Sequence, residues 1–394
     1  MSVRPNCAIC GEDILDADNS EEHIISRAIG GRRTVRGLLH VVCNNKAGQT
    51  WDAELERQLR PMALHFGVRR QRGRTPRMAI VTTAGEALLL GPKGELSMPR
   101  PDISRTPSAE GVRLQVTAGT VQQARAFLKS QKRKNPHIDI EGTLATAEVR
   151  RSYAKGVVQL QLDFGGERSG RSLVKSTLAL AYQAGLPITG CQDALAYLRQ
   201  PDGIPCFGYY YVDDLIAERP EATPLHCIAI DANPNTGLVL GYAEFFGVHR
   251  AVVCLGRGYR GEAVKSVYAI DPRTGEGLDL SVRLDFDAAD IEAIYDYRMD
   301  DAAGRQQALG RVFGPALRAQ QAAERDRVFK EALDYAWLNC GATKDAMLTA
   351  ENRATIARLF SERAASWIQH VAGVSEDAAR RQAKAFADHI LKTA

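Results

Sequence analysis

Two pairs of potential metal ligands lie about 30 residues apart near the start of the chain. Cys7 and Cys10 are separated by two residues, and His40 and Cys43 repeat that spacing. Such a pair can bind one ion from a tight turn, and two pairs together complete the tetrahedral coordination of Zn²⁺. We therefore predict a structural zinc site formed by these four side chains. Two alternatives are ordinary turns with buried thiols, and His40 as a plain strand residue.

A second group of reactive side chains is interleaved with the first. Glu22 and His23 lie between the two pairs, and Asn44 directly follows the last one. A neutral imidazole near physiological pH can take a proton from water. Carboxylate and amide oxygens suit a hard divalent ion, which polarises a phosphoryl oxygen. These residue types favour hydrolysis of a phosphate ester. The alternative for His23 is a structural strand histidine.

The hydrophobic pattern predicts the elements that position these side chains. Residues 22–25 are a strand candidate, Gly30 and Gly31 form a turn, and residues 35–42 are a returning strand. Apolar residues recur every four positions between about 46 and 59, which indicates a helix. Asp52 is expected to be a solvated residue of this helix. The predicted unit is strand, strand and helix, stabilised by zinc.

Residues 5–60 resemble the HNH (His-Me finger, ββα-metal) endonucleases, especially the zinc-containing branch similar to endonuclease VII. The resemblance implies that His23 is the general base and that Glu22 and Asn44 bind the catalytic Mg²⁺ or Mn²⁺. It also implies that the four Cys and His residues bind structural zinc. The chain departs from many relatives at Ser26, where they have Pro, and at Glu22, where Asp is more common. Neither departure removes a metal ligand.

Positive charge is concentrated just after the Glu-His pair. The whole chain has a net charge of +4, yet residues 24–78 carry 12 basic and 3 acidic side chains. Such clusters bind nucleic-acid phosphates non-specifically and with strong salt dependence. The alternative is a solvated linker whose arginines serve solubility. The candidate DNA-binding residues are Arg32, Arg33, Arg36, Lys46, Arg69, Arg70, Arg72 and Arg74.

The length of 394 residues predicts two or three domains. We expect an α+β protein, in which a small zinc-stabilised ββα-metal domain precedes a larger mixed α+β domain with a helical C-terminus. The expected bounds are 1–66 for the first domain, 67–78 for a basic linker, 79–287 for the mixed domain and 288–394 for the helical region. Strands are expected at 78–81, 87–90, 112–116, 146–149, 157–164, 226–230, 238–245, 251–255 and 266–270, and helices at 121–134, 173–184 and 193–199.

The remaining composition is that of an ordinary globular protein. No apolar run has the length of a membrane span, and the N-terminus does not read as a signal peptide, so a cytoplasmic location without membrane contact is expected. Five of the eight cysteines are scattered and are expected to be buried thiols in a reducing compartment. They are Cys191, Cys206, Cys227, Cys254 and Cys340.

A glycine-rich segment at residues 165–172 is spaced like a phosphate-binding P-loop. Arg171 stands where a P-loop requires lysine, and the two residues are not interchangeable there. A plain glycine-rich turn before a helix is the favoured interpretation. Nucleotide hydrolysis is not expected.

An aromatic run follows at Phe207, Tyr209, Tyr210 and Tyr211. Such rings could stack on a nucleobase or another ligand. More often, an aromatic run followed by an acidic pair is a strand in the core and its turn. Both interpretations stay open.

The combined expectation is a metal-dependent endonuclease that acts on duplex or branched DNA. The C-terminal region would be a sensor for an activating ligand or partner protein, as in a restriction or antiphage defence effector. One site nicks one strand, so a double-strand break would need a homodimer or repeated nicking. The alternative is a nucleic-acid-binding zinc protein with weak or vestigial nuclease activity.

Overall fold

The computed structural model describes residues 5–73, 75–108, 111–148, 152–342 and 347–393. The chain divides into two compact units. The first comprises Met1–Ile80, Ala87–Pro99 and Gln159–Gly314, and the second comprises Val81–Glu86, Arg100–Val158 and Pro315–Ala394. Mixed helices and strands with a helical C-terminal part confirm the α+β class. The four-part division with bounds at 66, 78 and 287 stays a prediction.

The N-terminal module of the first unit has the predicted order of strand, strand and helix. Its elements are β1 (Asn19–His23), β2 (Thr34–His40), α1 (Val41–Ala47), a π-helical turn (Gly48–Asp52) and α2 (Ala53–His65). β1 and β2 are antiparallel, with His23 opposite Thr34. The helix begins at Val41, so the expected start near residue 46 and the expected extension of the strand to residue 42 were wrong. Val41 and Val42 are exposed on the first helical turn.

The predicted Gly30-Gly31 turn follows a short 3-10 helix (Arg27–Ile29). Gly30 has a φ of 105°, in the left-handed region that favours glycine. A Cβ atom on Gly31 would lie 1.7 Å from the carbonyl oxygen of Ile25, so only glycine fits. Ser26 caps the 3-10 helix and donates a hydrogen bond to Glu56 at 2.6 Å. The turn and this cap together return the chain to β2.

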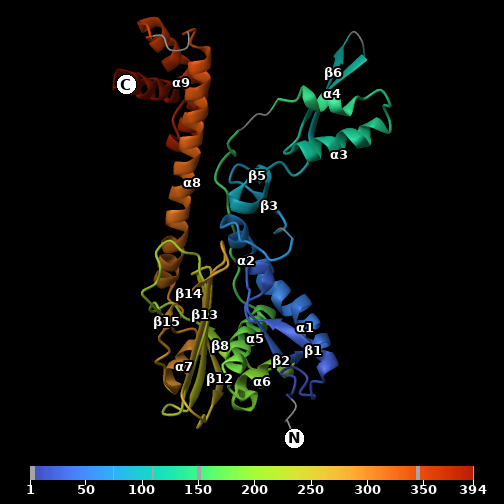
Figure 1. Cartoon of the computed structure of the whole chain (residues 1–394), viewed down its shortest axis with the longest axis vertical. Coiled ribbons are helices and arrows are strands. Elements are labelled where there is room, and N and C mark those ends of the chain that lie inside the picture. The colour runs from blue at the N-terminus through green and yellow to red at the C-terminus, as the bar shows by residue number, and fades with distance from the viewer. Residues whose placement is uncertain (1–4, 74, 109–110, 149–151, 343–346, 394) are drawn as a thin grey trace. The chain divides into compact units, whose positions relative to one another are not determined.

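A six-stranded antiparallel sheet forms the centre of the first unit (Figure 1). Its three central strands are buried on both faces over nearly their whole length. In spatial order they are β14 (Glu276–Leu278), β13 (Val264–Asp271), β10 (His226–Asn233), β11 (Leu238–Phe245), β12 (His249–Arg257) and β8 (Phe207–Tyr209). The four predicted strands of this region are confirmed. Helix α7 (Ala288–Tyr295) packs through Ile291 and Ile294 on one face of the sheet.

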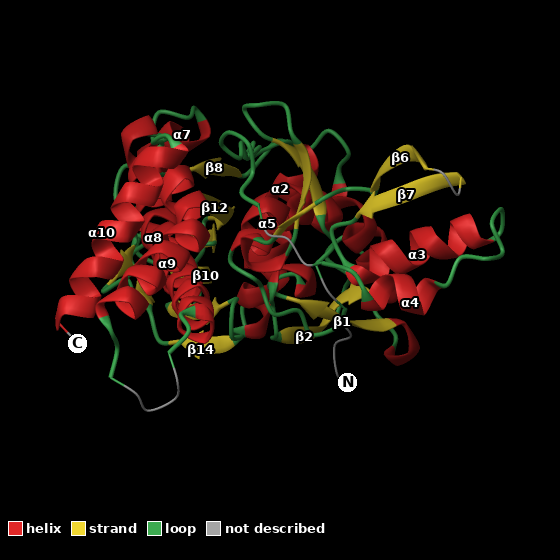
Figure 2. Ribbon diagram, turned by 90° about the horizontal axis from the view of Figure 1, so that it is seen from above, coloured by secondary structure: helices red, strands yellow, loops and turns green. Residues whose placement is uncertain are grey.

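Helix α5 (Glu167–Gln183) covers the other face (Figure 2). Helix α6 (Gln192–Arg199) packs beside it. Every residue from Ser169 to Ala181 is buried, because α5 lies between the sheet and the N-terminal module. A Cβ atom on Gly241 of β11 would approach the Thr177 side chain of α5 to 2.8 Å. Helix α5 thus forms a layer between the sheet and the N-terminal module, and both pack against it.

The second unit contains a hairpin, the helices α3 (Val121–Lys132), α4 (Ile140–Ala145), α9 (Ala350–Ala372) and α10 (Glu376–Thr393), and the part of α8 (Ala302–Asn339) that follows Gly314. β6 (Asp102–Ser108) pairs with β7 (Gly111–Thr117), followed by α3 and α4. Helices α8, α9 and α10 complete the chain, as predicted for the region after residue 288. None of the helices in the described part of the chain combines the length and apolar character that a membrane span needs.

Two expected strands were wrong. Residues 146–148 follow α4 without strand pairing, and residue 149 lies outside the described residues. Of residues 157–164, only Val158 forms an isolated bridge, to Thr82. Both segments alternate apolar and polar residues, but within the described residues no strand pairs with them beyond that single bridge. The small strands β3 (Met78–Val81), β4 (Ala87–Leu90) and β5 (Leu96–Ser97) form a separate sheet, as the pattern predicted for the first two.

His226 of β10 connects the sheet to the N-terminal module. The backbone N–H of Phe246 donates to Nδ1 at 3.0 Å, so the ring proton lies on Nε2, 2.8 Å from the carbonyl oxygen of Ile29. Burial lowers the pKa of His226 to about 4. His249 is equally buried, and its pKa is also lowered to about 4. Protonation of either ring opposes the folded state.

We predict that the free energy of unfolding falls as the pH is lowered from 6.5 to 4. The unfolded chain binds a proton at His226 in this range and the folded chain does not, a difference on the order of 3 kcal/mol. Denaturant unfolding at a series of pH values should show a shallower decline in His226→Gln, with the His249 contribution retained. His137→Gln, at an exposed position, should leave the profile unchanged. An equally steep decline in His226→Gln would contradict the assignment.

Candidate metal and catalytic site

The four predicted zinc ligands converge at the start of the N-terminal module. The ligand atoms of Cys7, Cys10, His40 and Cys43 all lie within 4.8 Å of one another. The Cys10 Sγ atom is 3.2 Å from His40 Nδ1, and the backbone N–H of His40 points to Cys7 Sγ at 3.5 Å. With Zn–S bonds of about 2.3 Å, ligand atoms of a tetrahedral site are separated by such distances. The cluster has the composition and spacing of a zinc site.

The surroundings of the cluster also suit a dication. His40 Nε2 lies 3.1 Å from the carbonyl oxygen of Asp13, which places the ring proton there and leaves the Nδ1 lone pair for a metal. Burial raises the pKa of the Cys43 thiol to about 12, and the neighbouring Cys7 and Cys10 add to the rise. Crowded thiols resist ionisation unless a cation is bound among them. The alternative of His40 as a plain strand residue is therefore disfavoured by its contacts.

His23 is the last residue of β1 and is half-buried. Burial lowers the pKa of its imidazole, and the nearby Arg27 and Lys175 act in the same direction. The ring is therefore neutral at physiological pH, which is the form that can accept a proton. Asn44 of α1 contacts the same strand two residues before His23, where its Nδ2 donates to the carbonyl oxygen of Glu21 at 3.3 Å.

Glu22 occupies the opposite face of β1. Successive strand side chains alternate between faces, and Glu21 is exposed whereas Glu22 is buried. The Glu22 carboxylate accepts a hydrogen bond from the Lys175 ammonium of helix α5. The same ammonium lies 2.7 Å from Asp52 Oδ2. Asp52 also accepts a hydrogen bond from Ser172, at 2.5 Å.

The buried triad of Glu22, Lys175 and Asp52 is shielded from water. The Lys175 and Glu22 side chains are 3% and 4% exposed, and Asp52 is 14% exposed. Burial alone would lower the pKa of Lys175, but Asp52 and Glu22 outweigh it and raise this pKa well above its usual value. Lys175 is therefore charged and neutralises one of the two carboxylates. The expectation that Asp52 is a solvated helix residue was wrong.

The basic residues predicted to bind DNA occupy different environments. Arg33, Arg36, Lys46, Arg69 and Arg72 are exposed, and Arg32 and Arg70 are half-buried. The Arg33 guanidinium lies 4.4 Å from the centre of the Tyr268 ring, and Arg36 lies 3.6 Å from the Glu21 carboxylate. Arg32 donates to the carbonyl oxygen of Arg69 at 2.8 Å, which links the β1–β2 loop to the basic segment. Arg74 lies outside the described residues.

The glycine-rich segment at residues 165–172 opens helix α5 but does not hold a phosphate through Arg171. This guanidinium is buried and donates to the carbonyl oxygens of Tyr197, Gln200 and Pro201 at 2.5 to 2.8 Å. It also lies 4.8 Å from the centre of the Tyr197 ring. Arg171 joins α5 to the end of α6, so the plain turn is the correct interpretation.

Residues 7–60 match the family model of the HNH endonucleases. The match confirms the resemblance of the N-terminal module and supports nuclease activity in general. It covers the zinc cluster, His23, Glu22, Asn44 and Asp52, and does not include Lys175. No curated protein and no solved structure matches the chain.

We predict that Cys10→Ser lowers the zinc content from about one ion per chain to near zero, because three ligands no longer close the tetrahedral site. Cys10 is exposed, so the substitution itself leaves no cavity in the core. Metal analysis of the purified full-length protein measures the effect. Cys191→Ser, at a buried thiol of the same unit, should retain zinc. Equal zinc content in the two variants would refute the site.

We predict that Lys175→Met lowers the free energy of unfolding by roughly 3–5 kcal/mol, because it leaves two buried carboxylates without a cation. Denaturant unfolding provides the measurement. Lys384→Met, which breaks an exposed pair with Asp388, should change stability little. Adding Glu22→Gln to Lys175→Met should recover part of the loss, since one unpaired charge is then removed. The absence of any recovery would show that the two residues do not act as a pair.

Proposed function

We propose that the chain is a metal-dependent endonuclease that hydrolyses DNA phosphodiester bonds, with His23 as the general base. The match of residues 7–60 to the HNH endonucleases carries this proposal. The lowered pKa of His23 supports it, because the imidazole is neutral under physiological conditions. Nε2 or Nδ1 of the ring would take a proton from the attacking water as its oxygen bonds to phosphorus. The bond from phosphorus to the leaving sugar oxygen would break in the same displacement, and that oxygen would take a proton from solvent water.

Nucleic-acid binding is proposed from the exposed basic side chains near His23. Arg33 and Arg36 belong to the same hairpin as His23, and Lys46 follows Asn44 on α1. None of the three is buried, so each can approach a phosphate. Contacts of this kind position a backbone without reading its sequence. Duplex or branched DNA is the proposed substrate.

The proposed metal ligands, Glu22 and Asn44, have the oxygen donors that Mg²⁺ or Mn²⁺ prefers. When bound, such an ion would polarise the phosphoryl oxygen. However, the Glu22 carboxylate is already bound by the Lys175 ammonium. It lies on the buried face of β1, whereas Asn44 contacts the backbone of Glu21. In this arrangement Glu22 does not fit a metal site beside Asn44, unless Lys175 leaves it.

This ion pair favours a second candidate function, a nucleic-acid-binding zinc protein with weak or vestigial nuclease activity. The zinc cluster and the basic surface would then act together in binding, and His23 would contribute little. The two candidates differ in whether His23 is needed for any strand cleavage. Both require the zinc cluster.

We further propose a regulatory role for residues 79–394, as the sensor of a restriction or antiphage defence effector. The proposal comes from the joining of a nuclease module to a much larger region, which is an argument by analogy. The structure offers one supporting contact: Lys175, which neutralises Glu22, belongs to this larger region. A homodimer is proposed for double-strand cleavage, since one site cuts one strand.

We predict that His23→Ala lowers the rate of DNA cleavage by about 10²- to 10⁴-fold, the contribution of a general base. The assay follows the loss of supercoiled plasmid with full-length protein, with and without Mg²⁺ or Mn²⁺. His137→Ala, at an exposed histidine of the second unit, should cleave like the unaltered protein. Zinc content should be equal in all three proteins.

Cleavage that needs the divalent ion and disappears in His23→Ala would support the nuclease. Full cleavage by His23→Ala would refute the role of His23. Salt-sensitive DNA binding by the unaltered protein without cleavage on plasmid or branched DNA would instead support the second candidate function. The gel bands of nicked and linear plasmid show whether the protein cuts one strand or both.

A further inference from the structure

The first unit contains a cavity of about 470 Å³ beside the N-terminal end of α5. Its walls come from the segment at 164–167, from β8 and the residues directly after it, and from the segment between Tyr297 and Arg305. This volume lies within the range of pockets that bind small molecules. None of the proposed zinc or catalytic residues lines it, so the cavity is a separate site.

Aromatic rings form most of one wall. Phe207, Tyr209 and Tyr211 stand at alternate positions, so the period of the strand turns all three toward the cavity. Tyr210, between them, turns to the other face and packs on Phe286 with ring centres 5.1 Å apart. The aromatic run of the sequence therefore divides into three rings that line the cavity and one that fills the core.

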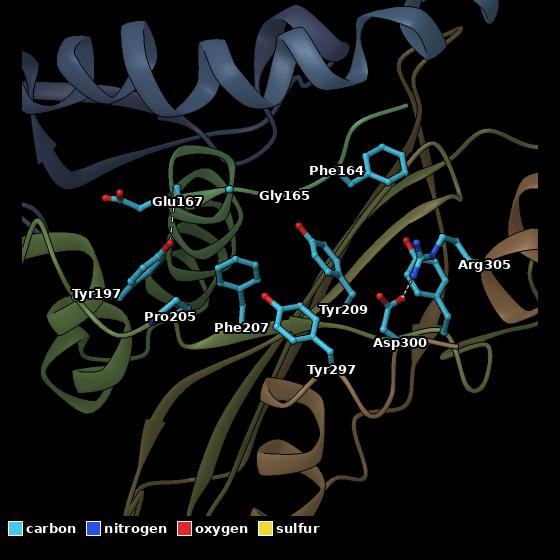
Figure 3. Close-up of a pocket in the computed structure, with 13 residues that line it drawn as sticks. Phe164, Gly165, Glu167, Tyr197, Pro205, Phe207, Tyr209, Tyr297, Asp300 and Arg305 are labelled. Atoms are coloured by element: carbon cyan, nitrogen blue, oxygen red, sulfur yellow. Dashed lines mark hydrogen bonds and ion pairs between the residues drawn. The ribbon is translucent and has the colours of Figure 1, made fainter. Parts of the chain in front are cut away.

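Two further rings complete the wall. Figure 3 shows Tyr197 and Tyr297 in a row with Phe207 and Tyr209, between Glu167 at one end and the Asp300–Arg305 pair at the other. The Tyr297 ring is centred 6.4 Å from that of Tyr209 and is 61% exposed. Neighbouring rings in this row are inclined to one another by 39 to 81°. A planar aromatic ligand can therefore stack on the accessible ring of Tyr297 while the inclined rings meet its edge.

Two polar atoms in this wall have no partner among the described residues. They are the hydroxyl oxygen of Tyr209 and Nε of Arg305, and both are buried. Two other tyrosine hydroxyls of the wall are engaged: Tyr211 donates to the carbonyl oxygen of Val248 at 2.8 Å, and Tyr197 to that of Glu167 at 3.1 Å. Buried polar groups are nearly always hydrogen-bonded. A ligand with hydrogen-bonding groups on its edge would satisfy both atoms.

The charges around the cavity limit the ligand further. Glu167 and Asp300 contribute two carboxylates, and Arg305 contributes one guanidinium, which binds Asp300 at 2.6 Å. A cluster of phosphates would meet net negative charge here. A planar, uncharged ring with donors and acceptors on its edge fits the stacking wall and the two unpartnered atoms. A nucleobase has this chemistry.

We propose that this cavity binds a nucleobase, which comes either from an unpaired nucleotide of the nucleic-acid strand or from a free nucleoside or mononucleotide. The choice of a nucleobase over other planar rings rests on the proposed nuclease function. The connection between the two sites supports it. Gln58 of α2 donates to the carbonyl oxygen of Gly165 at 2.7 Å and accepts from its N–H at 3.2 Å.

Helix α5 provides the second connection. It begins at Glu167 beside the cavity and carries Lys175, which binds Glu22 and Asp52. Eight residues of helix span about 12 Å. About two turns of one helix thus connect the edge of the cavity to the residue that binds Glu22 and Asp52.

The test uses the fluorescent base 2-aminopurine and the full-length His23→Ala protein without Mg²⁺ or Mn²⁺, so that no cleavage interferes. One probe is 2-aminopurine riboside, and the other is a DNA duplex with a single bulged 2-aminopurine. A duplex in which the 2-aminopurine is paired serves as the matched probe. Saturable fluorescence change with the riboside identifies a free nucleoside as the source. A change with the bulged duplex alone identifies the strand.

Tyr297→Ala should weaken this binding by about 5- to 100-fold, the usual effect of removing one stacking ring. Because Tyr297 is exposed, its removal leaves no cavity in the core, and far-ultraviolet circular dichroism checks the fold. Tyr209→Phe, which removes only the unpartnered hydroxyl, should weaken binding by about fivefold. Tyr259→Ala, outside the cavity, should bind like the parent protein.

The proposal is overturned if neither probe changes its fluorescence, or if Tyr297→Ala and Tyr209→Phe both bind like the parent protein. Failure of the proposed function is recognised separately. In that case the protein with His23 intact cleaves no DNA, while the base still binds and the tyrosine variants still weaken it. The two hypotheses are thus tested by different measurements on the same protein.

Discussion

The pairing of one buried ammonium with two buried carboxylates governs how the first unit is assembled. Each of these charges would be expensive to remove from water by itself, and their mutual attraction offsets that cost only when the geometry is kept. Glu22 and Asp52 come from the N-terminal module, and Lys175 comes from a helix more than 120 residues later. If the module separated from α5, these charged groups would lose their partners and would either be exposed to water or remain buried and unpaired. This constraint makes the HNH segment an integral part of the unit.

Zinc and the sheet serve different purposes in this unit. The cluster of Cys and His side chains holds the start of the module together, where few apolar residues are available to form a core. It also brings β2 and α1 together at His40 and Cys43. The sheet supplies the large core that α5 needs on its other face. His226 bridges the two by its hydrogen bond to Ile29. The hairpin that carries His23 thus lies between the Cys and His cluster on one side and the folded sheet on the other.

Local patterns predicted much of this structure. The ligand spacing identified the zinc cluster, and alternation or helical periodicity identified β10, β11, β12 and β13 and the C-terminal helices. Features that depend on distant partners were missed. Lys175 follows two apolar residues in the sequence, and nothing nearby shows that it meets Glu22. Asp52 was misjudged for the same reason. A charged residue within an otherwise apolar helical face was the only signal that could have identified Lys175.

The same reasoning explains why the aromatic run could not be resolved from the sequence. Aromatic rings serve both core packing and ligand binding. Which of the two roles a ring of β8 has depends on the residues that pack against its face of the strand. Ile294 of α7 packs behind Gly208, and Phe286 covers Tyr210, so that face is core. The opposite face meets the start of α5, where Gly165 and Gly166 carry no side chain to fill the space. A cavity results from these two glycines and from three rings that the strand holds apart.

One helix carries both the edge of this cavity and Lys175. Helix α5 is buried from Ser169 to Ala181, so a displacement of this segment at one site would involve the other site as well. Any ligand that binds more tightly to one position of α5 also changes the free energy of keeping Lys175 between Glu22 and Asp52, and the reverse holds by linkage. The proposed base site and the triad of Glu22, Lys175 and Asp52 therefore share one structural element, and a base bound at that site would lie at the start of the helix that carries Lys175.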